Sequence, residues 1–310
     1  MADYDLIIIG GGPAGLAAAA YALHAQLSVA LIAPDLGGKV TYPFALREMP
    51  ARDTVWGASL VRELEMRVRN NLDHHINADV KKLERLPDGR FAVHMNVGAP
   101  QTARAIVLAT GARPQRLYVP GETEYWGRGV SFSAISHAPF FQDRTVAVIG
   151  AGTRAVSAVL TLAPLARQIY FIISRAQELQ DTRAANLALN HPKVLAFRNW
   201  EVQQVEGDEF VRSIDLVGGN GEIRRLDVEG VFVQFGLLPN NSLVREFVAL
   251  DEDGHVIINQ RCETSVPGLF AAGDLTNIHA EQVPVSLGEG AKAALAAWEY
   301  LALHPKQDPA

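Results

Sequence analysis

The sequence predicts an α/β fold built from two Rossmann-like nucleotide-binding domains, each a three-layer ββα unit, with the second inserted in the first. Two distant segments, "DLIIIGGGPAGLAAAAYAL" from Asp5 and "TVAVIGAGTRAVSAVLTLA" from Thr145, each join an apolar strand to a small-residue helix through a glycine turn. Between and after them, strand-like and helix-like stretches alternate, which indicates parallel sheets. The 310 residues, 48% of them hydrophobic, are enough for two cores.

The apolar run from Leu6 to Leu23 is as long as a short membrane span. Three glycines and Pro13 interrupt it after a β-branched stretch, so we expect a strand, a tight turn and a helix. A polar amphipathic helix follows around residues 59–71, then a hairpin over 80–95 and a strand within "AIVLATGARP". These elements belong to the first domain, predicted over residues 1–115 and 245–310.

The inserted domain is predicted over residues 116–244. Its elements after the glycine turn are a strand in "QIYFIISR", a helix in "AANLALN", strands over 202–217 and a strand in "GVFVQFGLLPN". The segments "ARPQRLYVPGE" and "LLPNNS" are the expected crossings between the domains. The chain then returns to the first domain with "GLFAAGD" and the helix "GEGAKAALAAWEYLAL".

Composition excludes several classes of protein. The formal net charge is −6 and no block of Lys or Arg occurs, so we expect neither nucleic acid nor a membrane surface as a partner. Cys262 is the single cysteine, which rules out a disulfide within these residues and a thiolate metal cluster. We therefore expect a cytoplasmic protein without a bound metal or a spanning segment.

Gly10, Gly12 and Gly15 form G-x-G-x-x-G between the first strand and helix, with Pro13 and Ala14 inside the motif. The first glycine permits the turn, the second admits a pyrophosphate and the third lets helix and strand pack closely. The sequence therefore predicts a dinucleotide at the helix N-terminus. Asp35 is the nearest carboxylate for the ribose, and a solvated turn is the alternative interpretation of it.

The second turn has Gly150 and Gly152, with Ala155 at the third position, a permitted variant. Thr153 and Arg154 begin its helix. The next strand ends in "ISR" without a carboxylate, and an arginine suits a 2′-phosphate better than a free ribose. This pattern favours NADPH over NADH, and an ordinary surface arginine is the alternative.

The segments "IIIGGGPAGLAAA", "LGGKV", "ATGARP", "VIGAG", "FGLLPN" and "VPGLFAAGD" occur in this order, and together they resemble the low-molecular-weight thioredoxin reductase family over nearly the whole chain. The resemblance implies an FAD domain split by an NAD(P)H-type domain, a homodimer and hydride transfer through the flavin. It adds these expected FAD contacts to those of the first glycine turn: Gly38, Lys39, Ala109, Thr110, Gly111, Gly273, Asp274, Gln282 and Val283. On the NAD(P)H side it adds Ser174 and Arg175 to Gly150, Gly152, Thr153, Arg154 and Ala155.

The sequence departs from that family at its reactive positions. Ser133 and Ser136 stand where the family has its two redox cysteines, and His137 replaces an aspartate. Neither serine can form a thiolate or a disulfide, so we expect no dithiol exchange with thioredoxin. His137 is a candidate proton donor near the flavin, or else a histidine packed at the start of a helix. Cys262 lies alone near the FAD turn, where we expect an inert buried thiol.

Further departures affect the nucleotide contacts. The family's His-Arg-Arg reads Ile173-Ser174-Arg175, its Arg-Gln reads Glu281-Gln282 and its Gly-Gly-Gln ends in Lys39. We expect an FAD-dependent oxidoreductase that passes electrons from NAD(P)H or another donor to an unknown acceptor other than thioredoxin. Two alternatives are a ferredoxin- or flavodoxin-NADP reductase-like enzyme and a non-catalytic flavoprotein that acts as a redox sensor or binding partner.

Overall fold

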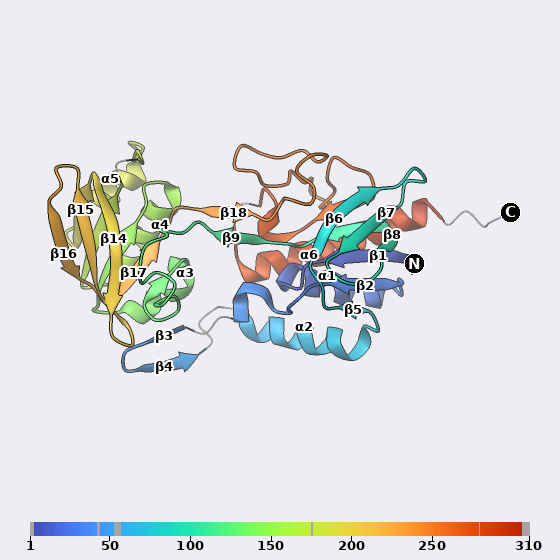
Figure 1. The fold of residues 1–310 in the computed structure, drawn as a ribbon, viewed down its shortest axis with the longest axis horizontal. Coiled ribbons are helices and arrows are strands. Elements are labelled where there is room, and N and C mark those ends of the chain that lie inside the picture. Colours follow the sequence, from blue (N-terminus) through green and yellow to red (C-terminus); the bar gives the residue numbers. More distant parts are fainter. Residues whose placement is uncertain (1–2, 42–43, 53–56, 175, 279, 306–310) are drawn as a thin grey trace. The chain divides into compact units, whose positions relative to one another are not determined.

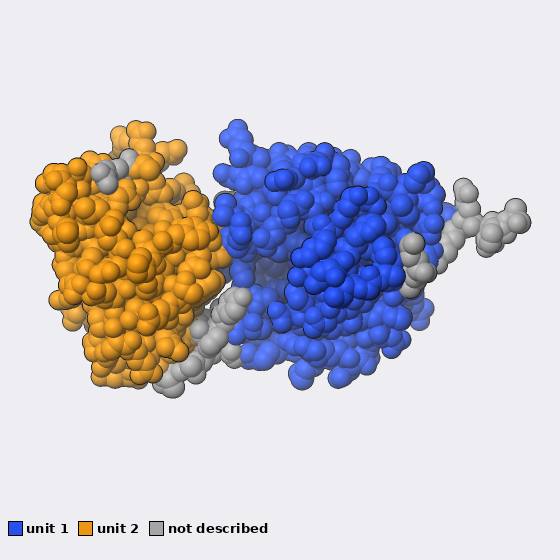
Figure 2. Space-filling model, in the orientation of Figure 1, with its two compact units in different colours: residues 1–41, 56–113, 238–310 blue, residues 42–55, 114–237 orange. Residues whose placement is uncertain are grey.

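The chain divides into two compact units, each formed from separate stretches of sequence (Figure 2). The computed structural model describes residues 3–41, 44–52, 57–174, 176–278 and 280–305, and for residues 50–52 the backbone alone. Unit 1 comprises Met1–Thr41, Trp56–Arg113 and Leu238–Ala310, and unit 2 comprises Tyr42–Val55 and Pro114–Leu237.

Unit 1 contains a sheet flanked by helices (Figure 1). Its elements are β1 (Asp3–Ile9), α1 (Pro13–His24), β2 (Val29–Ile32), α2 (Ala58–Asn71), β5 (His75–Ile76), β6 (Val80–Arg85), β7 (Phe91–Met95), β8 (Gln101–Leu108), β19 (Leu269–Ala271) and α6 (Val283–Leu303). The sheet order is β5-β2-β1-β8-β7-β6, and β19 also pairs with β8. Strand β8 pairs with antiparallel β7 through its first residues and with parallel β19 through its last ones.

The strands β5, β2, β1, β8 and β19 run parallel, so their carboxyl ends lie at one edge of the sheet. The predicted strand, turn and helix at the N-terminus are confirmed as β1 and α1, and the predicted hairpin as β6 and β7. Helices α1 and α6 pack closely because their buried residues are small: Gly290 of α6 faces the backbone of Ala14 so tightly that an added Cβ would collide with it.

Unit 2 has three layers. Its elements are β3 (Phe44–Leu46), β4 (Met49–Arg52), β10 (Val130–Ser131), α3 (Ala134–His137), β11 (Thr145–Ile149), α4 (Thr153–Leu162), β12 (Gln168–Ile173), α5 (Arg183–Leu189), β13 (Val194–Arg198), β14 (Trp200–Gly207), β15 (Val211–Gly218), β16 (Ile223–Asp227) and β17 (Gly230–Val233). A parallel sheet of order β10-β17-β11-β12-β13 lies between the antiparallel sheet β14-β15-β16 and the helices.

The core of unit 2 follows from strand alternation. Val146, Val148 and Phe171 pack with residues of α4 and α5, whereas Ala147 and Ile149 pack against the β14-β15-β16 sheet. Since successive side chains of a strand point to opposite faces, the central strands are apolar on both faces. The predicted α/β class and three-layer ββα arrangement are confirmed.

The units divide the chain differently from the predicted ranges at three places, the smallest of which is residues 114–115, which belong to unit 2. Residues 42–55 belong to unit 2, because Phe44 and Leu46 are buried in the cluster that contains α3 and α4. Residues 238–244 belong to unit 1, because Val244 packs into the core of that unit's sheet. The crossing segments contain β9 (Ala112–Pro114) and β18 (Leu237–Pro239), which pair with each other as a two-stranded ladder.

Among the described residues, no helix has the length and apolar character that membrane crossing requires. The first apolar run, from Leu6 to Leu23, is not one continuous helix, because its residues divide between β1, a glycine turn and α1.

Candidate functional site

The first candidate site is the turn between β1 and α1, at the carboxyl edge of unit 1's sheet. Gly10 has φ of +113°, and a Cβ there would collide with the carbonyl oxygen of Ala109 at the end of β8. A Cβ on Gly15 would collide with the carbonyl oxygen of Gly10, so the helix packs directly on the turn. At Gly12 an added Cβ would meet no heavy atom of the described residues within 4 Å. The turn is therefore closed on its inner side and open above Gly12.

This geometry fits a diphosphate. Gly12 is the N-cap of α1 and has no side chain, so no cap residue occupies the amides of the first helical turn. Those amides and the helix dipole attract a negative charge. Pro13 occupies the first helical position, where a backbone N–H has no acceptor within the helix. Its lack of an N–H therefore removes no hydrogen bond from α1.

Other predicted FAD residues lie around the same turn. Gly38 is so close that an added Cβ would come 2.9 Å from Cα of Gly12. Gly273, in the 3₁₀ turn Gly273–Leu275 after β19, faces the Cβ of Ala14. The structure therefore brings loops from distant parts of the sequence to one edge of the sheet.

An ion pair joins two of these loops. Nζ of Lys39 lies 2.6 Å from Oδ2 of Asp274, and the lysine side chain is 45% exposed whereas that of Asp274 is 14% exposed. The hydroxyl of Ser286, in the first turns of α6, lies 3.4 Å from the other carboxylate oxygen, Oδ1. Ser286 is a contact that the sequence reasoning missed.

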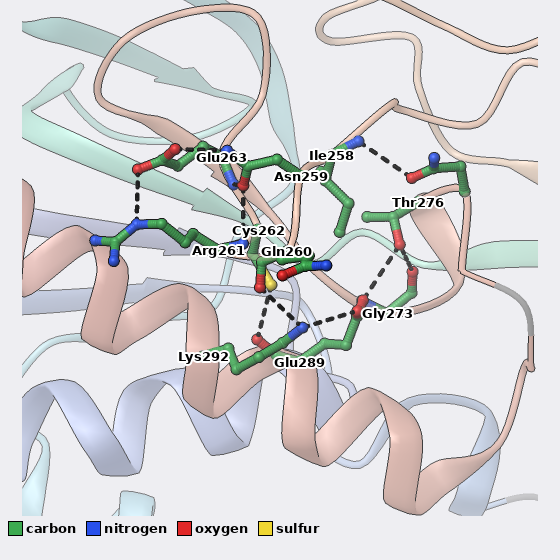
Figure 3. A network of polar contacts seen from close by, with 11 residues as sticks. Ile258, Asn259, Gln260, Arg261, Cys262, Glu263, Gly273, Thr276, Glu289 and Lys292 are labelled. Carbon is green, nitrogen blue, oxygen red and sulfur yellow. Dashed lines mark hydrogen bonds and ion pairs between the residues drawn. The ribbon is translucent and has the colours of Figure 1, made fainter.

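Glu289 supports the turn that carries Asp274. Its Oε2 accepts hydrogen bonds from the amide of Gly273 and the hydroxyl of Thr276, each at 3.3 Å (Figure 3). Its Oε1 lies 3.6 Å from Nζ of Lys292, which donates to the carbonyl of Gln260 at 3.3 Å. The Glu289 side chain is only 12% exposed, so a largely buried carboxylate links α6 to the turn. The sequence reasoning missed this role, for which the one signal is an acidic residue amid the small residues of "GEGAKAALAA".

Cys262 lies beside this network. Its thiol is fully buried, with Sγ 3.6 Å from the carbonyl oxygen of Glu289. Burial, with a smaller contribution from the Glu289 carboxylate, raises the pKa of the Cys262 thiol to about 11. The thiol is therefore protonated and shielded at neutral pH, as expected for an inert cysteine.

The remaining predicted FAD residues lie in the loops after β2 and β8 and at the start of α6. Thr110 and Gly111 follow β8, and both bond to Asn240: the Thr110 hydroxyl donates to its carbonyl at 2.9 Å. Gln282 is the N-cap of α6, and its side-chain amide donates back to the carbonyl of Glu281 rather than capping the helix; Val283 is the first helical residue. The Asp35 side chain is exposed.

The second candidate site, in unit 2, repeats the first glycine turn. Gly150 has φ of +143°, and an added Cβ would lie 2.7 Å from the carbonyl oxygen of Gln234. Gly152 is the N-cap of α4, and no atom of the described residues lies within 4 Å of a Cβ added there; Thr153 begins the helix. Ala155 is fully buried at the position of the third glycine. Arg154 is half-buried, and it has a polar, ring or electrostatic interaction of its own.

The described residues at the end of β12, Ile173 and Ser174, carry no cation for a ribose phosphate. The hydroxyl of Ser174 accepts a hydrogen bond from the amide of Ala176 at 3.1 Å, so it caps its own turn, and Ile173 is buried in the core. Arg175 was the predicted cation here and lies outside the described residues.

The two serines lie together at the start of α3. The Ser133 hydroxyl donates to Oγ of Ser136 at 3.0 Å, and it accepts a longer hydrogen bond from the Ser136 amide. Both side chains are half-buried, and Ile135 between them is 65% exposed. The pair is a neutral hydroxyl contact that caps a short helix.

His137 is packed rather than free. Its ring stacks on Phe44 of β3 with centroids 4.0 Å apart, and Nδ1 lies 2.7 Å from the hydroxyl of the buried Ser131. Burial lowers the pKa of His137 to about 4, so the imidazole is neutral at pH 7. Packing at the helix start was the alternative that the sequence left open, but Phe44, 93 positions earlier, was not foreseen as the partner.

Two glycine turns on parallel sheets define a protein with two dinucleotide sites. The chain belongs to the pyridine nucleotide-disulphide oxidoreductase family, whose model matches residues 4–290. Family membership implies FAD and NAD(P)H as cofactors. It also confirms the resemblance that the segments in order had indicated.

Curated relatives include a component of the alkyl hydroperoxide reductase of Pseudomonas aeruginosa, 34% identical over 308 residues, and a NADH dehydrogenase of Bacillus subtilis, 33% identical over 301 residues. Each alignment covers 96% of this chain and 58% of the relative, so the chain spans less than two thirds of these proteins.

Solved structures are similar over their whole length. The thioredoxin reductase of Streptococcus pyogenes is 30% identical with a TM-score of 0.85, covering 97% of this chain and 99% of that one. The thioredoxin reductase of Giardia duodenalis is 26% identical with the same TM-score, covering 97% of this chain and 100% of the other.

Proposed function

We propose that the protein is an FAD-dependent oxidoreductase that transfers electrons from NADH or NADPH to an acceptor other than thioredoxin. The observation that carries the proposal is the hydroxyl pair of Ser133 and Ser136, 3.0 Å apart, where the family resemblance places the redox dithiol. The names of the relatives, a component of alkyl hydroperoxide reductase and a NADH dehydrogenase, support an electron-transfer role.

The serine pair argues against dithiol exchange on chemical grounds. Reduction of a disulfide requires a thiolate to attack one sulfur and a second thiol to resolve the mixed disulfide. A hydroxyl neither ionises near neutral pH nor forms a disulfide. Cys262 cannot take over, because its thiol is buried, belongs to unit 1 and has a pKa raised to about 11 by that burial.

The geometry of the first site supports FAD. The open face above Gly12 and the uncapped start of α1 suit the diphosphate, and Asp274 with Lys39 is the polar group beside it. When bound, FAD supplies a ring that accepts a hydride and passes its electrons on. The residues of this chain would hold and orient that cofactor. The amides of the first turn would bind the diphosphate, and the Asp274 carboxylate would accept a hydrogen bond from a hydroxyl of the ribityl chain.

The second site supports a nicotinamide nucleotide as donor, because Gly150, Gly152 and Ala155 reproduce the geometry of the first turn. The 2′-phosphate of NADPH finds weaker binding groups, since the Ser174 hydroxyl already accepts a hydrogen bond from the amide of Ala176 and Ile173 carries no charge. We therefore expect weak discrimination between NADH and NADPH.

An anaerobic titration tests the proposal. NADH and NADPH are added in turn to the purified flavoprotein while the oxidised flavin band is recorded, and the reduced protein is then mixed with an artificial quinone or with a small disulfide. We expect at least one nucleotide to bleach the band, the quinone to restore it and the disulfide to leave it bleached. Failure of both nucleotides, or reoxidation by the disulfide as fast as by the quinone, would contradict the proposal.

A further inference from the structure

We infer that Gln234 is a nucleotide-binding residue of the second glycine turn, whose side-chain amide donates a hydrogen bond to an acceptor oxygen of the bound nicotinamide dinucleotide. This rests on the proposed function, because the ligand is the electron donor proposed above. Gln234 directly follows β17, and its amide donates to the carbonyl of Ile149 at 2.8 Å. Its own carbonyl faces Gly150, so it borders the turn.

The side chain of Gln234 is buried and incompletely paired. The residue is 5% exposed, and Nε2 has no hydrogen-bond partner among the residues that the structure describes. A buried donor without an acceptor is costly, and more than nine in ten buried polar groups in proteins are satisfied. The other such atom within the described ranges is Oε1 of Gln177, in the loop after β12, which ends at the same edge of the sheet. A ligand at this edge would supply the missing partners.

Strand alternation gives the side on which Gln234 lies. Val231, Val233 and Phe235 pack into the cluster shared with the β14-β15-β16 sheet, whereas Phe232 packs into the cluster shared with α3 and α4. A period of two therefore places Gln234 on the helix side, with Phe232. That is the side on which Gly152 leads into α4.

Two independent features thus meet at one place. The start of α4 has a glycine N-cap without a side chain, and a Cβ added there would meet none of the described atoms within 4 Å. The amide of Gln234 adds a neutral donor beside this anion-binding helix end. A donor of this kind suits the diphosphate or the nicotinamide ribose of a dinucleotide, which present acceptor oxygens.

The test replaces the amide by a side chain of similar size. Gln234→Leu and wild-type flavoprotein are titrated calorimetrically with NADH and with NADPH, and their melting temperatures are measured without nucleotide. We expect the Kd of the nucleotide bound by the wild type to rise about tenfold, equivalent to about 1.4 kcal/mol. The melting temperature should stay the same or rise, because the variant no longer buries an unpaired donor.

Gln204→Leu is the matched control, because Gln204 on β14 already donates to Glu206 and Asp215. It should leave the nucleotide Kd unchanged. Equal Kd values for wild type and Gln234→Leu would overturn the inference and leave the proposed function standing. Weaker binding with a lower melting temperature would show a structural role and overturn it as well. A wild type that binds neither nucleotide would overturn both the inference and the proposed donor.

Discussion

Lys39 and Asp274 are 235 positions apart in the sequence, yet Nζ of the lysine lies 2.6 Å from Oδ2 of the aspartate. The pair connects the loop after β2 to the 3₁₀ turn after β19, beside the open face above Gly12. The lysine offsets the charge of a carboxylate that would otherwise oppose the diphosphate at the start of α1. Both residues were predicted as FAD contacts, but their pairing was not predicted.

Lys39→Gln should weaken FAD binding. Removing the cation leaves the Asp274 carboxylate uncompensated near an anionic ligand, and because Lys39 is 45% exposed the effect should correspond to ~0.2–1 kcal/mol, about a 1.4- to fivefold rise in Kd. The difference should shrink at high salt, since ions screen exposed charges. Fluorescence titration of the deflavinated protein measures it. Lys81→Gln, which removes another exposed lysine paired with Asp79, should change nothing; an equal effect in both variants would refute a local role.

Glu289→Ala should destabilise the protein and weaken FAD binding together. The variant leaves the Gly273 amide without its acceptor, whereas the Thr276 hydroxyl still donates to the Gly273 carbonyl at 2.8 Å. The free energy of unfolding should therefore fall by about 1–3 kcal/mol, and the FAD Kd should rise about tenfold. Urea unfolding and FAD titration provide the measurements.

Glu289→Gln retains an acceptor oxygen and should recover much of the FAD affinity lost in the alanine variant. Glu299→Ala removes an exposed carboxylate from the same helix and should change stability by less than about 0.5 kcal/mol. If Glu289→Ala bound FAD as tightly as wild type, the carboxylate would not position the turn.

The fold and the backbone of both sites could be predicted because they depend on local patterns. The glycines at 10, 12 and 15 and those at 150 and 152 act within one strand, turn and helix, and their spacing is visible in the sequence. The apolar strands around them are equally local. Family segments in a fixed order then indicated that Lys39 and Asp274 belong to one site.

Contacts between distant side chains could not be predicted in this way. Nothing in "YPFALREM" indicates that this segment belongs to unit 2 or that Phe44 stacks on His137. Periodicity gives the face of an element but not its partner. The same holds for Glu289, whose neighbours suggest only a packed helix. Gln234 follows an apolar strand, and it is notable only because its buried Nε2 has no partner among the described residues.

His137 should make the protein sensitive to mild acid. Its pKa is lowered to about 4 in the folded state from an ordinary 6.5, so the unfolded chain binds the proton more readily. The stability that depends on neutral His137 is complete above pH 6.5 and is lost as the pH falls through 4. The loss should reach up to about 3 kcal/mol.

Urea unfolding of wild type and His137→Phe between pH 7 and pH 4 measures this dependence. The phenylalanine retains a ring against Phe44 but does not titrate, so the variant should lose less stability over that range than wild type. His24→Asn, at the exposed end of α1, should follow the wild-type curve. Parallel curves for wild type and His137→Phe would show that this histidine does not contribute to the acid sensitivity.

The protein should form a homodimer, as the resemblance to thioredoxin reductases implies. Multi-angle light scattering at micromolar concentrations should give twice the chain mass of 33.6 kDa. A mass of one chain across that range would refute the prediction.

Ser133 and Ser136 stand where the family resemblance places the redox dithiol, so we expect no dithiol chemistry from this protein. The most direct measurement compares wild type with the double variant Ser133→Cys, Ser136→Cys for reduction of thioredoxin by NADPH. We expect no enzymatic rate from wild type and, at most, partial activity from the double variant. The variant should still bind NADPH weakly, because Ile173 carries no charge for the 2′-phosphate and the Ser174 hydroxyl already accepts a hydrogen bond from Ala176. Rapid reduction of thioredoxin by the wild-type protein would contradict the account.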